Sequence, residues 1–207
     1  MRGRFISLEG GEGVGKSTQA KRLARALRDR KVDVIETREP GGSPGAEAIR
    51  KLLLEGEVDR WTAETEALLF AAARSDHVAR TIRPALDHGQ WVLTDRFIDS
   101  SLAYQGGAGG VGMNNIMKLH RIGSGGLLPD RTLLLDLPIH DAAWREFARD
   151  EGDLDRFGRK EGGYHEALGA AFRSLAADDP GRFRVVDAEG TEEDVTARLL
   201  AAVEDLL

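Results

Sequence analysis

A loop near the start of the chain constrains its fold and chemistry more than any other feature. Residues 10–17 read Gly-Gly-Glu-Gly-Val-Gly-Lys-Ser, which fits the phosphate-loop pattern G-x-x-x-x-G-K-S. An apolar run suited to a buried strand precedes the loop at residues 5–8, and a helical run follows at residues 19–27. Glycines let the backbone turn tightly there, and its N–H groups and the helix start attract phosphate. The sequence therefore predicts a phosphate-binding loop between a strand and a helix.

Side chains of this loop have expected tasks in holding a nucleoside triphosphate. Lys16 is expected to reach the β- and γ-phosphates, and the hydroxyl of Ser17 is expected to bind Mg²⁺. We expect ATP to contact Gly10, Gly11, Glu12, Gly13, Val14, Gly15, Lys16, Ser17 and Thr18. ATP is thus the predicted phosphoryl donor, and Mg²⁺ is the predicted cofactor.

Strands alternate with helices along the rest of the chain. Runs typical of strands occupy residues 5–8, 32–37, 91–94, 132–137 and 183–186. Helical runs lie at residues 19–27, 46–54, 62–86, 114–122, 141–149 and 165–177, and a capping box of Thr191 and Asp194 opens a final helix to Leu207. This alternation predicts an α/β fold with a five-stranded parallel sheet and helices on both faces. In such sheets ligands bind beyond the carboxyl ends of the strands.

Two segments carry more detailed expectations. The long helix at residues 62–86, with Pro84 as its candidate break, should bury a face that includes Leu68, Leu69, Ala72 and Val78. A glycine-rich stretch at residues 106–112 should follow a short helical piece.

The composition excludes several classes of protein. The 207 residues fit a single domain, 1–207, and the lack of cysteine excludes disulfides and thiolate metal sites. A formal net charge of −6 argues against nucleic-acid binding through bulk charge, and no apolar run reaches membrane-spanning length. We therefore expect a cytoplasmic protein with small-molecule partners and with neither nucleic acid nor membrane among them.

Three groups of residues beside the loop suit a nucleotide site, and each has a plainer interpretation. Asp95 and Arg96 follow an apolar strand, where they can hold Mg²⁺ and bridge phosphates or form an ordinary surface ion pair. Phe70 and Arg74 lie four residues apart and can grip a planar base, although spacing alone favours a core ring and a solvated charge. Residues 100–105 offer hydroxyls and an amide that can read a nucleoside or open a helix.

A charged, glycine-containing segment at residues 150–163 has the character of a mobile lid. Basic side chains lie in and around it at Arg145, Arg149, Arg156, Arg159 and Lys160. They can close over a polyphosphate and exclude water, or they can belong to a charge-balanced loop, since Asp150, Glu151, Asp153 and Asp155 are interleaved. The five histidines show no metal-ligand spacing.

Taken together, these motifs resemble the thymidylate kinase family, within the phosphate-loop nucleoside monophosphate kinases. The matching stretches are residues 5–19, 37–43, 69–74, 93–106, 129–130 and 155–157. The resemblance implies transfer of the γ-phosphoryl group of ATP to dTMP, which yields dTDP for dTTP and DNA synthesis. It also implies a homodimer that forms through packed helices.

The resemblance assigns roles to residues that bind the acceptor. Phe70 would stack on thymine, Arg74 would hydrogen-bond its edge, and Tyr104 would sit against the sugar and disfavour a 2′-hydroxyl. Glu12 would approach the 3′-hydroxyl, and Arg96 would bind the acceptor phosphate and bridge to the donor. The remaining expected substrate contacts are Arg38, Pro40 (where the family often has a cis peptide bond), Arg50, Ser101 and Gln105.

The resemblance is to the bacterial form, in which the lid supplies a catalytic arginine. We expect Lys16, Arg96 and Arg149 to be catalytic, with Arg156 as the second lid candidate. Family members carry Glu after the lid motif and arginines in the next helix, where this chain has Gly158, Ala167 and Gly169. We assign the metal to Ser17 and Asp95, while Glu12 and Glu9 stay open as alternative carboxylates.

Two other functions fit parts of the sequence. The first is a kinase for another small acceptor, such as a deoxynucleoside or a different monophosphate, against which Phe70 and Arg74 argue. The second is a nucleotide-dependent switch without an acceptor, against which the base-binding helix and the lid argue.

Overall fold

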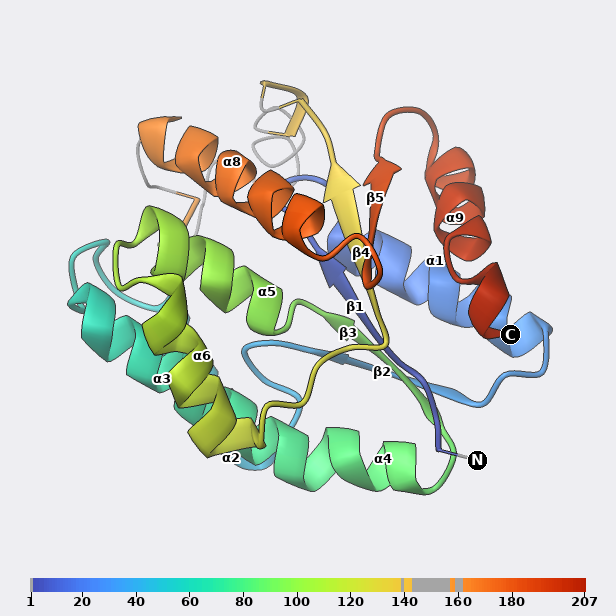
Figure 1. Cartoon of the computed structure of the whole chain (residues 1–207), viewed down its shortest axis with the longest axis horizontal. Helices are drawn as coiled ribbons and strands as arrows, with labels where there is room; N and C mark the ends of the chain where they lie inside the picture. Colours follow the sequence, from blue (N-terminus) through green and yellow to red (C-terminus); the bar gives the residue numbers. More distant parts are fainter. Residues whose placement is uncertain (1, 139, 143–156, 159–161) are drawn as a thin grey trace.

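A parallel sheet forms the centre of the computed structural model, which describes residues 2–138, 140–142, 157–158 and 162–207. Its strands are β1 (Phe5–Glu9), β2 (Val34–Arg38), β3 (Trp91–Asp95), β4 (Arg131–Asp136) and β5 (Phe183–Asp187). Five strands pair in the order β2-β3-β1-β4-β5, so β1 is central, with Ser7 opposite Thr94 and Thr132 (Figure 1). The predicted strands and the predicted fold class are confirmed.

Helices cover both faces of this sheet (Figure 1). They are α1 (Lys16–Asp29), α2 (Pro44–Leu54), α3 (Ala63–His77), α4 (Arg83–Asp87), α5 (Ile98–Ser101), α6 (Met113–Ser124), α8 (Gly162–Asp178) and α9 (Glu192–Ala201). Two π-helical segments, η1 (Val78–Ile82) and η2 (Leu102–Ala108), continue α3 and α5, and the 3₁₀ turn η3 (Glu204–Leu206) follows α9. In the described part of the chain, no helix has the length and apolar character to cross a bilayer.

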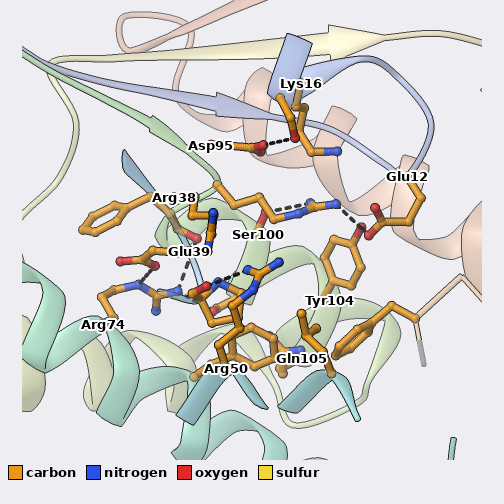
Figure 2. Close-up of a pocket in the computed structure, with 18 of the residues that line it drawn as sticks. Glu12, Lys16, Arg38, Glu39, Arg50, Arg74, Asp95, Ser100, Tyr104 and Gln105 are labelled. Carbon is orange, nitrogen blue, oxygen red and sulfur yellow. Dashed lines mark hydrogen bonds and ion pairs between the residues drawn. The ribbon is translucent and has the colours of Figure 1, made fainter. Parts of the chain in front are cut away.

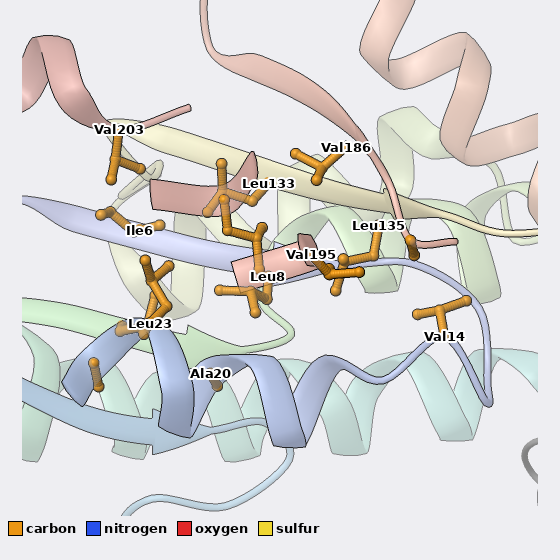
Figure 3. Close-up of a cluster of buried hydrophobic side chains, with 14 of the residues drawn as sticks. Ile6, Leu8, Val14, Ala20, Leu23, Leu133, Leu135, Val186, Val195 and Val203 are labelled. Carbon is orange, nitrogen blue, oxygen red and sulfur yellow. The ribbon is translucent and has the colours of Figure 1, made fainter. Parts of the chain in front are cut away.

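The alternation of side chains along β1 explains the two main hydrophobic clusters. Ile6 and Leu8 face α1 and α9, where they join a cluster with Leu23 and Val195 (Figure 3). Phe5 points to the opposite face, into a second cluster with residues of η1, α4 and α5. A strand buried on both faces in this way is expected at the centre of a parallel sheet. The core thus holds β1 and α1 firmly, and with them the loop that joins them.

The long helix differs from its prediction in two ways. It does not break at Pro84 but widens into η1 just before it, and the N–H of Arg83 bonds to the carbonyl of Val78. Proline lacks an N–H and clashes with the carbonyl four residues back in a regular helix, which a widened turn relieves. The predicted apolar face is wrong at Leu68 and Ala72, which are exposed. The buried face of α3 instead carries Glu66, Ala67, Ala73, Arg74 and His77.

The glycine-rich stretch also departs from its prediction, because η2 continues through Gly106 and Gly107 to Ala108. A Cβ atom on Gly107 would lie 3.0 Å from the Cβ of Ala171 in α8, so glycine permits close packing of the two helices. The predicted lid at 150–163 lies mostly outside the described residues, and its last two residues belong to α8.

The capping box is confirmed at the start of α9. The backbone N–H of Asp194 donates to Oγ1 of Thr191 over 3.2 Å, and the N–H of Thr191 donates to the Asp194 carboxylate over 3.1 Å. These bonds satisfy two donors that a helix start leaves without partners. The turn between β5 and α9 is therefore held in place beside α1.

Candidate active site

A cavity of about 410 Å³ opens at the carboxyl ends of β1, β2 and β3 (Figure 2). Its walls come from the phosphate loop, the turns after β2 and β3, and helices α2, α3, α5 and η2. The predicted site residues that line it are Glu12, Gly13, Gly15, Lys16, Ser17, Thr18, Arg38, Pro40, Arg50, Phe70, Arg74, Asp95, Arg96, Ser101, Tyr104 and Gln105. Gly10, Gly11 and Val14 do not line it, and Arg149 and Arg156 lie outside the described residues.

The phosphate loop takes a shape that depends on its glycines. Gly13 and Gly15 have φ angles of 72° and 94°, which side chains rarely adopt. A Cβ atom on Gly13 would also lie 2.0 Å from the carbonyl oxygen of Ala142. Lys16 is buried and its ammonium group donates to the carbonyl of Gly11. Burial, followed by the charge of Arg96, lowers the pKa of Lys16 to about 8, a shift that a bound polyphosphate would oppose.

The turn after β3 holds Arg96 in a strained backbone conformation. Its φ angle of 69° is left-handed, which costs a non-glycine residue about 1–2 kcal/mol. The N–H of Arg96 donates to the carbonyl of Leu8 over 2.9 Å, and its carbonyl accepts from the hydroxyl of Thr94 over 2.9 Å. The N–H of Phe97 donates to the buried carboxylate of Glu9 over 2.8 Å. These bonds to β1 and β3 fix the turn and direct the arginine into the cavity.

The guanidinium of Arg96 lies between the phosphate loop and η2. It donates to the carbonyl of Gly10 over 2.9 Å, to the hydroxyl of Ser100 over 3.1 Å and to the carboxylate of Glu12 over 2.6 Å. Its central carbon lies 4.9 Å from the ring centre of Tyr104, whose hydroxyl also donates to Glu12 over 2.7 Å. This planar fork is therefore held between the phosphate loop and the start of η2, inside the cavity.

Three carboxylates near the loop have different environments. Burial disfavours the charged form of Glu12, but Arg96 and Lys16 outweigh it and lower the pKa of Glu12 to about 2. Burial and the charge of Asp99 raise the pKa of Glu9 to about 8, and Glu9 accepts from the hydroxyl of Ser100 over 2.6 Å. Glu9 is thus held by Ser100 and Phe97, and Glu12 is held through its Oε1 by Arg96 and Tyr104.

Asp95 differs from Glu9 and Glu12 because one of its two carboxylate oxygens has no hydrogen-bond partner among the described residues. Its Oδ2 accepts from the hydroxyl of Ser17 over 2.5 Å. Its Oδ1 is buried without a hydrogen-bond partner among the residues that the structure describes. Such an orphaned acceptor next to a hydroxyl fits a magnesium ion or its water ligands. Within the described residues no three acidic or imidazole groups are arranged so that they could hold a metal ion together, so the ion would also need water and phosphate oxygens.

Arg74 lies at the opposite end of the cavity and is only 3% exposed (Figure 2). Its Nε donates to Glu39 over 2.7 Å, and its Nη2 donates to the hydroxyl of Ser101 over 2.7 Å. The interpretation of Arg74 as a solvated charge is therefore wrong. Phe70, one turn earlier on α3, is half-buried beside the ring of Phe157, 5.9 Å away between ring centres. A planar group bound between Phe70 and Arg74 would meet the ring of Phe70 and the donor fork of Arg74.

Glu39 and His77 form a support for Arg74 that the sequence analysis missed. Nδ1 of the fully buried His77 lies 3.0 Å from Glu39, and its Nε2 lies 2.7 Å from the hydroxyl of Thr37. A carboxylate only accepts hydrogen bonds, so Nδ1 carries the proton. Other cavity-lining residues not predicted as site residues are Leu54, Phe97, Ser100 and Phe157. Glu39, Phe97, Ser100 and Phe157 stand inside motif stretches that the sequence analysis recognised, and this position was the signal that could have found them.

Two arginines lie on the β2 side of the cavity. Arg38 is half-exposed and donates to the carboxylate of Glu47 over 3.2 Å. Arg50 donates to the carbonyl of Pro40 over 2.7 Å, and the Glu39–Pro40 peptide bond is cis, as the resemblance implies. Both cations can turn toward an anion in the cavity without breaking the core.

A second cavity of about 470 Å³ lies on the other side of the phosphate loop and was not predicted. It is lined by Gly13, Val14, Gly15, Thr18 and Gln19 on one side and by Ala188, Gly190, Thr191, Glu192 and Val195 on the other. The amide of Gln19 donates to the carbonyl of Glu192 over 3.0 Å and joins the two sides. The end of β5 is also a carboxyl end of the sheet, so the rule used for the other strands could have found it.

Comparison with known proteins gives one consistent family. A model of the thymidylate kinase family matches residues 8–199 of the chain. Thymidylate kinase from Rhizorhabdus wittichii is 62% identical over 207 residues, which cover 100% of both chains. The one from Bradyrhizobium diazoefficiens is 48% identical over 100% of this chain and 91% of the relative. The crystal structure of thymidylate kinase from Ehrlichia chaffeensis is 27% identical, with a TM-score of 0.77 over 100% of both chains.

Proposed function

The chain belongs to the thymidylate kinase family, and on this premise we propose that the two cavities beside the phosphate loop hold dTMP and ATP. The reaction transfers the γ-phosphoryl group of ATP to the phosphate of dTMP and yields ADP and dTDP. The observation that carries the proposal is the layout of the cavity at the carboxyl ends of β1, β2 and β3. It has an aromatic ring and a donor fork at one end and clustered cations beside the phosphate loop at the other.

The base and sugar of dTMP fit the end of the cavity near α3. Phe70 would stack on thymine, and the fork of Arg74, with Ser101 and Gln105 beside it, would hydrogen-bond the base edge. Glu12 and Tyr104, which are joined by a 2.7 Å hydrogen bond, would face the sugar. Glu12 would accept from its 3′-hydroxyl, and the Tyr104 ring would disfavour a 2′-hydroxyl.

Replacing Phe70 with alanine should raise the KM for dTMP about 10- to 100-fold, because base stacking on an aromatic ring contributes about 1–3 kcal/mol. The turnover number at saturating dTMP should change far less, since the ring does not touch the reacting phosphates. Steady-state ADP release at varied dTMP measures both constants. Glu64→Ala, an exposed change on the same helix, is the matched control. An unchanged KM in folded F70A protein would place the base elsewhere.

The phosphates of both substrates would meet between Lys16 and Arg96. Phosphoryl transfer depends mainly on positioning and on compensating negative charge, and the acceptor phosphate is already anionic. Lys16 would neutralise the donor phosphates, and Arg96 would release Glu12 and bridge to the acceptor. Arg38 and Arg50 are further candidates for the acceptor phosphate. We also retain Arg149, with Arg156 as second candidate, as the lid arginine, and both lie outside the described residues.

The nucleoside of ATP would occupy the second cavity, because Gly13, Gly15 and Thr18 line both cavities and so place them on two sides of the phosphate loop. A triphosphate that threads the loop would then join the two cavities. The donor and acceptor nucleosides would lie on opposite sides of Lys16, which suits an in-line transfer.

Ser17 and Asp95 would hold Mg²⁺, which would neutralise and orient the triphosphate. Asp95→Asn keeps the shape and an acceptor for Ser17 but removes the charge. We expect the Mg²⁺ concentration for half-maximal activity to rise about tenfold or more, in line with losses at altered metal sites. Titration of activity with Mg²⁺ at fixed ATP measures it. The same Mg²⁺ requirement in D95N and unaltered protein would assign the metal to another carboxylate.

We further propose a homodimer that works in the cytoplasm, where the nucleotides that it uses are supplied. Leu68 on α3 and Ile122 on α6 are 56% and 84% exposed, and the two helices pack together through a 2.7 Å bond from Ser75 to the carbonyl of Gly123. Apolar side chains exposed on neighbouring helices suit contact with a second copy.

A further inference from the structure

The amide of Gln105 lines the cavity, and a carboxylate holds it from behind. Gln105 is 1% exposed, and its Nε2 donates to Oε1 of Glu66 over 2.9 Å. Glu66 comes from the buried face of α3 and is not part of the cavity wall. It is therefore placed to act on a ligand through Gln105 and not by contact.

The hydrogen bond to Glu66 determines which end of the Gln105 amide can bind a ligand in the cavity. A carboxylate accepts hydrogen bonds and does not donate them, so the NH₂ end of Gln105 must face Glu66. The side-chain oxygen Oε1 of Gln105 is then left over, and it accepts no hydrogen bond from the residues that the structure describes. A mobile glutamine could present either a donor or an acceptor, whereas Gln105 held by Glu66 presents an acceptor.

The donors of Arg74 and the acceptor of Gln105 match the hydrogen-bonding groups of thymine and uracil but not those of cytosine. Thymine and uracil carry a donor at N3 and an acceptor at O4, while cytosine carries an acceptor at N3 and a donor at the neighbouring amino group. Arg74 can only donate, and the free end of Gln105 can only accept. A site built on such buried groups strongly rejects a ligand that leaves them unpaired.

From this we propose that Glu66 is a positioning residue that sets the polarity of the base site and makes the enzyme select an N3–H base over cytosine. The inference rests on the placement of the base between Phe70 and Arg74 proposed above. It assigns selectivity to a side chain that does not itself contact the nucleotide.

Glu66→Gln tests the inference. An amide at position 66 can donate or accept, so the amide of Gln105 could flip and present either its NH₂ group or its oxygen to the base. We expect the ratio of kcat/KM for dTMP to that for dCMP to fall about tenfold or more, the equivalent of one hydrogen bond. The ratio for dTMP to dUMP should hold, since both bases carry an N3–H. ADP release with each monophosphate gives these ratios, and thermal unfolding checks the fold.

The exchanged pair E66Q/Q105E is the matched control. The amide introduced at position 66 would donate to the carboxylate introduced at position 105, whose second oxygen would again face the cavity as an acceptor. The charge of the pair would be unchanged. We expect this double variant to recover most of the preference for dTMP over dCMP. If Glu66 only stabilised the fold, the double variant would not recover this preference. The double variant also tests the inference if the single variant E66Q does not fold.

The possible outcomes separate this inference from the proposed function. Folded E66Q protein with the original dTMP-to-dCMP ratio would overturn the role of Glu66 and leave the base site intact. A folded exchanged pair without recovered selectivity would also overturn it. Equal use of dTMP and dCMP by the unaltered enzyme would instead contradict the placement of the base itself.

Discussion

Replacing Arg96 with alanine should lower the turnover number about 10³- to 10⁵-fold, the range known for arginines that stabilise a phosphoryl-transfer transition state. The reason lies in its position. The guanidinium donates to the carbonyl of Gly10 and to the carboxylate of Glu12, and the strained turn at φ 69° directs it there. No other described side chain contacts both the phosphate loop and α5 with a planar fork. Turnover at saturating ATP and dTMP, measured by ADP release, gives the effect.

Two comparisons make the Arg96 result interpretable. Arg96→Lys keeps the charge but loses the fork, so it should recover only part of the lost rate. Arg28→Ala removes an exposed arginine that pairs with Glu36 at the surface and should leave turnover near its original value. Folded R96A protein that retained a tenth of the original turnover would refute the bridging role of Arg96.

Replacing Lys16 with alanine should lower kcat/KM for ATP about 10²- to 10³-fold, the typical cost of removing one preorganised group from a charged transition state. Lys16 is buried at the start of α1, and its ammonium group already faces the loop through the carbonyl of Gly11. It therefore needs little rearrangement to meet a γ-phosphate.

The matched control is Lys21→Ala, because Lys21 is an exposed lysine on the same helix. It loses the same charge without touching the loop and should keep kcat/KM for ATP nearly intact. Equilibrium binding of dTMP alone should change little in K16A, since Lys16 serves the donor. Similar losses in both lysine variants would mean that general charge, and not the position of Lys16, supports the reaction.

The strands and the phosphate loop could be predicted because their signals are local. Apolar runs such as the one around Ile6 and Leu8 end at polar residues, and the loop pattern stands between a strand and a helix. The rule that ligands bind at carboxyl ends then placed Asp95 and Arg96 beside the loop. These inferences need only neighbouring residues and one general property of parallel sheets.

The inward face of α3 could not be predicted in the same way. Periodicity assigns apolar side chains to the core, yet α3 turns Glu66, Arg74 and His77 inward and leaves Leu68 exposed. The partners that make this burial tolerable, Glu39 and Gln105, come from other elements. Buried polar groups are stable only when they are paired, and such pairing across distant segments leaves no periodic signal.

We expect this enzyme to transfer phosphate from ATP to dTMP in preference to other nucleoside monophosphates. The most direct test is ADP release with ATP, Mg²⁺ and each nucleoside monophosphate in turn. Strong release that depends on dTMP, with a much weaker response to dCMP and to ribonucleotides, is the result that the site predicts. Release at the same rate with every acceptor, or none with dTMP, would contradict a site specific for dTMP.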